Sequence, residues 1–194
     1  MAWSKLDVIN LAFSLLNKSS VGDVVNSGVF ADSASRAYEL LFPSSISGKS
    51  WRFATTSQEL NQLVTEPPID RWQYQYQLPS DYLAAVRTYP RMDFQIYGDK
   101  LYSNHNAVVL EYRFQPDITH CPAYYIHYLA YVIAAWYADS VAENEKLAER
   151  LLTLSDRQLG EALFTDSQSH PTPSMENNPV ILSRMGGWYN DGRC

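Results

Sequence analysis

The sequence contains few of the residues that carry most enzymatic and metal chemistry. Its 194 residues include four histidines and two cysteines, Cys121 and Cys194. Two scattered cysteines are too few for a disulfide framework, and a zinc site needs about four ligands, which no CxxC, HxxxH or HExxH motif supplies. The glycine-rich motifs GxGxxG and GxxxxGK[ST] and the nucleophile motif GxSxG are absent as well. The sequence therefore predicts no enzyme, no bound metal and no cofactor.

Charge is also scarce, and its balance is negative. Charged residues make up 19% of the chain, with a formal net charge of −6 and no dense basic run. Binding to nucleic acid depends on lysine and arginine displacing counterions from the phosphates. Residues 101–194 hold 6 basic and 11 acidic residues, so most of the negative excess lies in the second half. We therefore expect no general attraction between this chain and DNA.

No long hydrophobic run is present. The most apolar stretch, residues 124–138, is too short to span a bilayer and is interrupted by His127. The opening residues MAWSKLD lack the basic segment and apolar stretch of a secretion signal. We therefore expect neither a membrane partner nor export.

What the chain does contain is apolar and aromatic material. Hydrophobic residues make up 46% and include 14 tyrosines, so the sequence is that of a folded domain. Tyrosine has a large apolar face and a polar tip, which suits surfaces that become buried when a partner binds. A tyrosine-rich core explains the composition equally well.

Apolar residues at helical spacing predict four helical segments. They cover residues 4–17, 33–42, 123–140 and 145–164. Ser4 is the predicted N-cap of the first, Asp32 or Ser33 that of the second, and Asn144 that of the fourth. Pro43 should kink or end the second helix, because proline lacks the backbone donor and clashes with the preceding turn. Residues 46–53 are expected to resume as helix and run on towards Val64.

From Trp72 the period changes from about 3.6 residues to 2. In WQYQYQL, residues 72–78, aromatic residues alternate with glutamines, which predicts a strand with its tyrosines towards the core and its glutamines towards solvent or a neighbour. Turn signals separate further predicted strands of one small antiparallel sheet. These strands cover residues 81–89, 94–97, 101–102 and 107–114.

The predicted fold is α+β and mainly α. It consists of a helical bundle (residues 1–68 and 119–165), an inserted small antiparallel β-sheet (residues 69–118) and an extended C-terminal linker and arm (residues 166–194). The segment after Phe164 is polar and proline-bearing, and it leads into an apolar stretch too short to form a core. This stretch either docks elsewhere or folds back on its own domain.

Two chemical alternatives remain. Cys121 and His127, with His120, are the one cluster that resembles a catalytic or metal site, although ordinary residues at a helix start explain them too. The glutamines and tyrosines of residues 72–78 could serve a glycan-binding strand, because aromatic rings stack on sugars and amides bond hydroxyls. The alternation places the two sets on opposite faces, which weighs against that use.

The order of motifs resembles the tail tubular protein A family, the head-to-tail adaptors of short-tailed bacteriophages. The motifs are WRFAT, then WQYQYQLPSDYLAAV, FQIYGDKLYSN and VVLEYRF, followed by a long Ala/Tyr-rich helix and an amphipathic helix. The resemblance covers roughly residues 4–165. None of the motifs is catalytic, so the likeness rests on order and spacing.

Membership would imply a homo-oligomeric ring, usually of twelve subunits, in the virion between the portal protein and the tail nozzle protein. The subunits would be made in the bacterial host cytoplasm, and DNA would pass through the ring without sequence-specific binding. A small glycan-binding tail accessory module is the alternative function. In such adaptors C-terminal segments commonly grip the portal. The portal-docking candidates here are Pro179, Val180, Ile181, Leu182, Arg184, Met185, Trp188 and Tyr189.

A ring requires two different, complementary patches on each subunit. The candidates from the sequence are the helix at residues 123–140 and the Gln/Tyr-rich sheet. An acidic ring also suits a conduit, because a basic lumen would hold the DNA.

Overall fold

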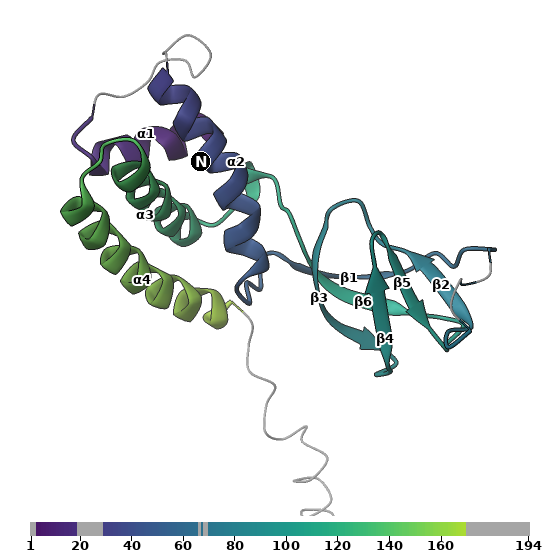
Figure 1. The fold of residues 1–194 in the computed structure, drawn as a ribbon. Helices are drawn as coiled ribbons and strands as arrows, with labels where there is room; N and C mark the ends of the chain where they lie inside the picture. Colours follow the sequence, from purple (N-terminus) through teal and green to yellow (C-terminus); the bar gives the residue numbers. More distant parts are fainter. Residues whose placement is uncertain (1–2, 19–28, 66, 68–69, 170–194) are drawn as a thin grey trace, which may run out of the picture.

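The computed structural model describes residues 3–18, 29–65, 67 and 70–169, and the statements below concern these residues. They form a helical lobe and a β lobe that lie side by side (Figure 1). The helices are α1 (Lys5–Leu15), α2 (Val29–Ser47), α3 (Ala123–Ser140) and α4 (Glu145–Gln168). The strands are β1 (Thr55–Glu59), β2 (Tyr74–Gln77), β3 (Tyr82–Tyr89), β4 (Phe94–Tyr97), β5 (Lys100–Ser103) and β6 (Val109–Phe114). The predicted α+β class is confirmed.

Helix α3 is the centre of the helical lobe. It contacts α1, α2 and α4, and most of its circumference is buried, including Tyr125, Leu129, Ile133 and Tyr137, while Ala123 and His127 are exposed. A helix that is apolar on every side requires such an enclosed position. The prediction that α3 offers a patch to neighbouring subunits therefore fails for most of its surface, which its own chain covers.

Helix α1 begins after Ser4, the predicted N-cap. Ser4 and Asp7 form a capping box, in which the Ser4 hydroxyl accepts from the Asp7 amide and the Asp7 carboxylate accepts from the Ser4 amide. At the other end the Lys18 amide donates to the Phe13 carbonyl (2.9 Å), and Asn17 takes the left-handed conformation (φ 54°). This arrangement satisfies carbonyls that the last turn would otherwise leave free.

Helix α2 differs from its prediction at both ends. It begins at Val29, so Asp32 lies in the first turn instead of capping the helix. Pro43 lies inside the helix, which continues to Ser47. Phe42 and Ile46, on either side of the proline, are both buried in the core of the helical lobe. We infer that this burial outweighs the hydrogen bond that proline cannot make.

The β region begins earlier than expected, and its strands form two sheets instead of one. The expected helix over residues 46–53 ends at Ser47, and β1 follows within the range assigned to the helical bundle. The sheets have the strand orders β1-β6-β3 and β2-β5-β4. Leu110 and Tyr112 of β6 share a small core with Tyr76 and Leu101 of the other sheet. Thr55–Glu59 is polar and mostly exposed, so its sequence lacks the alternation that marks a half-buried strand.

The Gln/Tyr-rich segment forms a strand as predicted, but its glutamines do not all face away from the core. Tyr76 is buried as predicted, yet Gln75 is buried too, at 2% exposure. Its side-chain amide donates to the Thr65 carbonyl (2.7 Å), and the Leu63 amide donates to the Gln75 carbonyl (2.9 Å). The chain before β2 therefore covers part of the glutamine face, so that face is less available to a neighbour than predicted.

Helix α4 extends beyond its predicted end. Asn144 caps it as predicted, with its side-chain oxygen accepting from the Leu147 amide (3.1 Å). The helix continues to Gln168, so the predicted linker does not begin at residue 166. The apolar spacing of residues 145–164 predicts that Leu152 points inward, but its side chain is 57% exposed. The predicted arm from residue 170 onward lies outside the described residues.

We expect the protein to lose stability in alkali because its buried tyrosines resist ionisation. Burial, together with the nearby Asp81 carboxylate, raises the pKa of Tyr112 to about 12, and burial raises the pKa of Tyr125. The folded state therefore keeps protons that the unfolded chain releases near its ordinary tyrosine pKa of about 10. This contribution to stability is complete below about pH 10 and disappears as the pH rises towards 12.

Urea unfolding followed by circular dichroism checks this expectation at about pH 8 and about pH 11. The free energy of unfolding should be lower at the higher pH, and Tyr112→Phe should reduce the difference. An unchanged free energy across this range would contradict the burial of these hydroxyl groups.

Candidate functional site

The two lobes meet at residues 51–54, the segment between α2 and β1. Trp51 is completely buried in the helical lobe, where its indole N–H donates to the Ser45 carbonyl (3.0 Å). Its ring lies edge-on to Tyr125, with 5.2 Å between the ring centroids. A buried tryptophan with its polar atom satisfied is a strong anchor. The WRFA motif of the sequence is thus the joint between the lobes.

Asp166, near the end of α4, holds this joint from the other side. Its carboxylate accepts hydrogen bonds from the backbone amides of Arg52 (2.6 Å) and Phe53 (3.4 Å) and from the Tyr124 hydroxyl (2.8 Å). The residue is only 1% exposed. A buried carboxylate is tolerated when such donors replace its water. Asp166 therefore ties the last turn of α4 to the segment that enters the β lobe.

Arg113 of β6 makes a second link between the lobes. Its guanidinium donates to the Ser47 carbonyl at the end of α2 and to the Ser50 hydroxyl (3.2 Å). The last carbonyls of a helix lack intrahelical donors and carry partial negative charge, so a cation is well placed there. The β lobe is therefore held to the helical lobe by side chains as well as by its connecting strands.

An open cleft of about 700 Å³ lies beside this joint. Its walls are the 50–52 segment and the outer face of the β1-β6-β3 sheet. We call it the junction cleft, and it is lined by Ser50, Trp51, Arg52, Thr55, Thr56, Ser57, Val86, Arg87, Tyr89, Val109, Glu111 and Arg113.

Strand register explains why these residues face one cleft. Thr55 pairs with Arg113, and Glu111 pairs with Arg87. Because alternate residues of a strand share a face, these positions lie on one side of the sheet. The intervening residues, such as Leu110, lie on the opposite side in the core of the β lobe. The cleft floor is therefore the polar face of a half-buried sheet.

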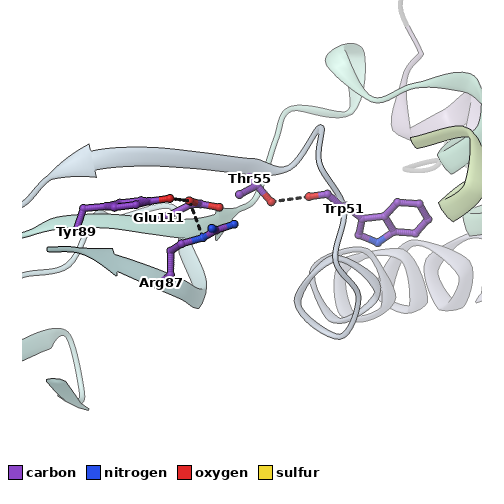
Figure 2. A network of polar contacts seen from close by, with 5 residues as sticks. All are labelled: Trp51, Thr55, Arg87, Tyr89 and Glu111. Atoms are coloured by element: carbon purple, nitrogen blue, oxygen red, sulfur yellow. Dashed lines mark hydrogen bonds and ion pairs between the residues drawn. The ribbon is translucent and has the colours of Figure 1, made fainter. Parts of the chain in front are cut away.

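A polar network crosses this floor (Figure 2). The Nε atom of Arg87 lies 3.0 Å from the Glu111 carboxylate, and the Tyr89 hydroxyl donates to the same oxygen (3.2 Å). At the end of the cleft nearer the helices, the Thr55 hydroxyl donates to the Trp51 carbonyl (2.6 Å). The carboxylate thus orients the Arg87 side chain, which remains 59% exposed.

The charge of the junction cleft contrasts with that of the whole chain. Three guanidinium groups (Arg52, Arg87 and Arg113) line it against the single carboxylate of Glu111, in a protein of net charge −6. Guanidinium groups bind carboxylates and phosphates through paired N–H donors. The cleft is therefore chemically suited to an anionic partner group.

The cluster singled out from the sequence is not arranged for nucleophilic catalysis. Cys121 is buried, and its thiol lies 3.6 Å from the Asp117 carbonyl oxygen as a weak donor. Burial and the Asp117 charge raise the pKa of Cys121 to about 12, so the thiol stays protonated at neutral pH. His127 is exposed and packs its ring against Tyr131 instead. These contacts weigh against the hypothesis of a Cys121–His127 hydrolase.

Two other sequence hypotheses concern metals and membranes. Within the described ranges, no group of three or more His, Cys, Asp or Glu side chains is placed to hold a metal ion. None of the helices in the same ranges is both long and apolar enough to cross a bilayer.

The side chains proposed for a glycan-binding strand do not form an exposed surface on which sugars could stack. Tyr76 is 1% exposed and donates to the His105 carbonyl from inside the β lobe. Gln75 is buried, and the Gln77 amide is engaged by Asp99. These side chains are occupied within the chain and do not form a stacking surface for sugars.

Sequence reasoning missed the junction cleft, and its predicted site lies elsewhere. All of the portal-docking candidates from Pro179 to Tyr189 lie outside the described residues. One pattern in the sequence could have indicated part of the cleft. In VLEYRF the alternation of residues places Glu111 and Arg113 on the polar face of the strand. The matching positions on β1 and β3 become evident only when the strands are paired.

We expect Asp166→Asn to lower the free energy of unfolding by about 3 kcal/mol, because hydrogen bonds to a buried charge are lost. The new side-chain amide would place N–H donors against the backbone N–H groups of the joint. Asp156→Asn is the matched control, since Asp156 is exposed on the same helix. The control should change stability by less than about 0.5 kcal/mol. Equally small losses in both variants, measured by urea unfolding, would show that Asp166 does not hold the joint.

Comparison with known proteins found no protein-family model and no curated protein that matches this chain.

Proposed function

We propose that the protein is a structural head-to-tail adaptor of a short-tailed bacteriophage. In this proposal twelve subunits form a ring between the portal and the tail nozzle, which lengthens the DNA channel and helps to retain the packaged genome. The motif series from WRFAT to VVLEYRF supports this function through its resemblance to the tail tubular protein A family. No catalytic step and no cofactor is part of it.

The observation that carries the proposal is the two-lobe plan of the subunit. A β lobe is inserted between α2 and α3, and the described chain places it to one side of the helices (Figure 1). The lobes are joined through the WRFA segment, which is one of the three most specific pieces of the resemblance, with the Y-x-Y-x-LP-x-D pattern and IYGDKL. A ring subunit needs different surfaces at its two ends, and an elongated pair of lobes provides them.

Exposed apolar side chains give secondary support. Among the described residues, large apolar side chains remain exposed on both lobes, including Leu152 and Phe164 on α4 and Val86 in the junction cleft. Scattered exposure of this kind is ordinary in a monomer. Its presence on α4 leaves apolar area on the last described helix for neighbouring subunits to cover.

The finer architecture belongs to the same proposal. The helical lobe acts as the bundle that forms the body of the ring, and the segment after α4 acts as the arm. Helix α4 ends close to the joint, because Asp166 contacts Arg52 and Phe53. The arm would therefore leave the body near the junction of the lobes and carry its apolar residues, Pro179 to Tyr189, to the portal.

Electron microscopy of the protein mixed with its cognate portal tests this function. We expect a ring of subunits on one face of the portal, in register with its symmetry. A monomer alone in solution is compatible with the proposal, because assembly can depend on the portal. Free monomer in the presence of excess portal would overturn it.

Deletion of residues 175–194 tests the arm separately. We expect the truncated protein to keep the circular dichroism spectrum and unfolding midpoint of the full chain, because the described residues already form a helical core and a β core. We also expect it to lose portal binding, measured by co-sedimentation. Loss of folding on truncation would show that the segment is part of the core.

A further inference from the structure

We propose that the junction cleft of one subunit receives the turn between α3 and α4 of a second copy of this chain. Glu143 lies in that turn, with Asp139 in the last turn of α3 and Glu145 at the start of α4, and we call these residues the acidic corner. The inference rests on the proposed ring and names the contact between its neighbouring subunits. The carboxylates of the acidic corner would bind the exposed arginines of the cleft.

The cleft presents two guanidinium groups to a partner. The Arg87 side chain is more than half exposed, and its orientation is set by the Glu111 carboxylate, which binds its Nε atom. Arg52 is also exposed, while its backbone amide is held by Asp166. Arg113 is already committed to Ser47 and Ser50 and serves the joint. Arg52 and Arg87 therefore supply the positive charge for binding. The Arg52 backbone is already held by Asp166 before a partner binds.

The acidic corner is the complementary surface. Asp139, Glu143 and Glu145 are all exposed around one tight turn, and Lys146 lies beside them. The turn is ordered by two backbone hydrogen bonds, from the Val141 amide to the Tyr137 carbonyl and from the Asn144 amide to the Ala138 carbonyl (both 3.0 Å). A rigid turn loses little conformational entropy on docking. Its three carboxylates match Arg52 and Arg87, and Lys146 matches Glu111.

The positions of the two surfaces favour a ring over a dimer. The α3–α4 turn lies at the end of the helical lobe remote from the β lobe, whereas the cleft lies where the lobes meet (Figure 1). A contact between two different patches is heterologous, so each subunit keeps one free patch after pairing. Repetition of the contact then closes a ring or extends a filament. The portal would select the closed form.

DNA phosphate is the competing occupant of an arginine-bearing cleft. The acidic corner is favoured because Glu111 lies on the cleft floor and would repel a polyanion, while a mixed-charge turn can satisfy both signs. The protein as a whole is also negative, which disfavours DNA at long range.

Charge reversal in two complementary variants tests the contact. The cleft variant is Arg52→Glu with Arg87→Glu, and the corner variant is Glu143→Lys with Glu145→Lys. On cognate portal, each variant alone should show a drop of roughly tenfold or more in ring occupancy by electron microscopy, because like charges then face each other. An equal mixture of the two should restore the ring, since alternating subunits pair reversed cleft with reversed corner and native cleft with native corner.

The outcomes separate this inference from the proposed function. If the unaltered protein forms no ring on portal, the adaptor function fails. If the unaltered protein forms a ring but both variants assemble equally well, or if the mixture is not rescued, the contact is wrong while the adaptor function stands. A cleft variant that loses binding to a short DNA duplex in fluorescence anisotropy, without rescue by mixing, identifies nucleic acid as the occupant and also overturns the contact.

Folding of the variants is checked by circular dichroism and thermal unfolding. The Arg87–Glu111 ion pair is partly exposed, at 59% for Arg87 and 19% for Glu111, and such pairs contribute little to stability, so we expect the cleft variant to fold. If it does not, Arg52→Gln with Arg87→Gln replaces it. This neutral pair should weaken assembly with the unaltered corner, and unchanged assembly would again overturn the contact.

Discussion

The buried carboxylate of Asp166 holds together parts of the chain that are far apart in sequence. It accepts hydrogen bonds from the backbone of residues 52 and 53 and from Tyr124, so it joins α4, α3 and the entry to the β lobe at one point. Trp51 fills the helical side of the same joint, and Arg113 closes it from the β side. Without these contacts the two lobes would be linked by their connecting segments alone, and the junction cleft would have no defined shape.

Because the joint fixes the β lobe at one end of the helical lobe, the two ends of the subunit differ. The α3–α4 turn lies at one end of the helical lobe, and the β lobe adjoins the other end (Figure 1). The junction cleft lies where the lobes meet. Helix α3 uses most of its apolar surface inside its own lobe, so in the proposed ring other surfaces, such as α4 and the cleft, would contact neighbouring subunits. The contacts of a ring would then be polar and guided by charge, with apolar residues such as Val86 adding area. Such contacts suit a subunit that stays separate until the portal arranges it.

Charge has two roles in this arrangement. In the proposed adaptor, the net negative charge of the chain would keep the channel from binding DNA, and it also makes an arginine-bearing cleft unusual. The proposed subunit contact would hide those arginines from the channel by pairing them with carboxylates of the neighbour. The proposed function and the proposed contact therefore both require the cleft arginines to be paired with carboxylates.

The sequence by itself determined the helices whose signals are local. Ser4 with Asp7 and the cap at Asn144 predicted two helix starts correctly, and the alternation in residues 72–78 and 107–114 predicted two strands, because these signals depend on neighbours within a few positions. Tertiary structure decided the rest. Pro43 stays helical because Phe42 and Ile46 are buried, β1 forms because β6 pairs with it, and Gln75 is buried because residues 63–65 cover it. The junction cleft likewise exists only because strand pairing and the Asp166 contact bring residues of three strands and of the 50–52 segment to one face, and no local pattern encodes such pairing.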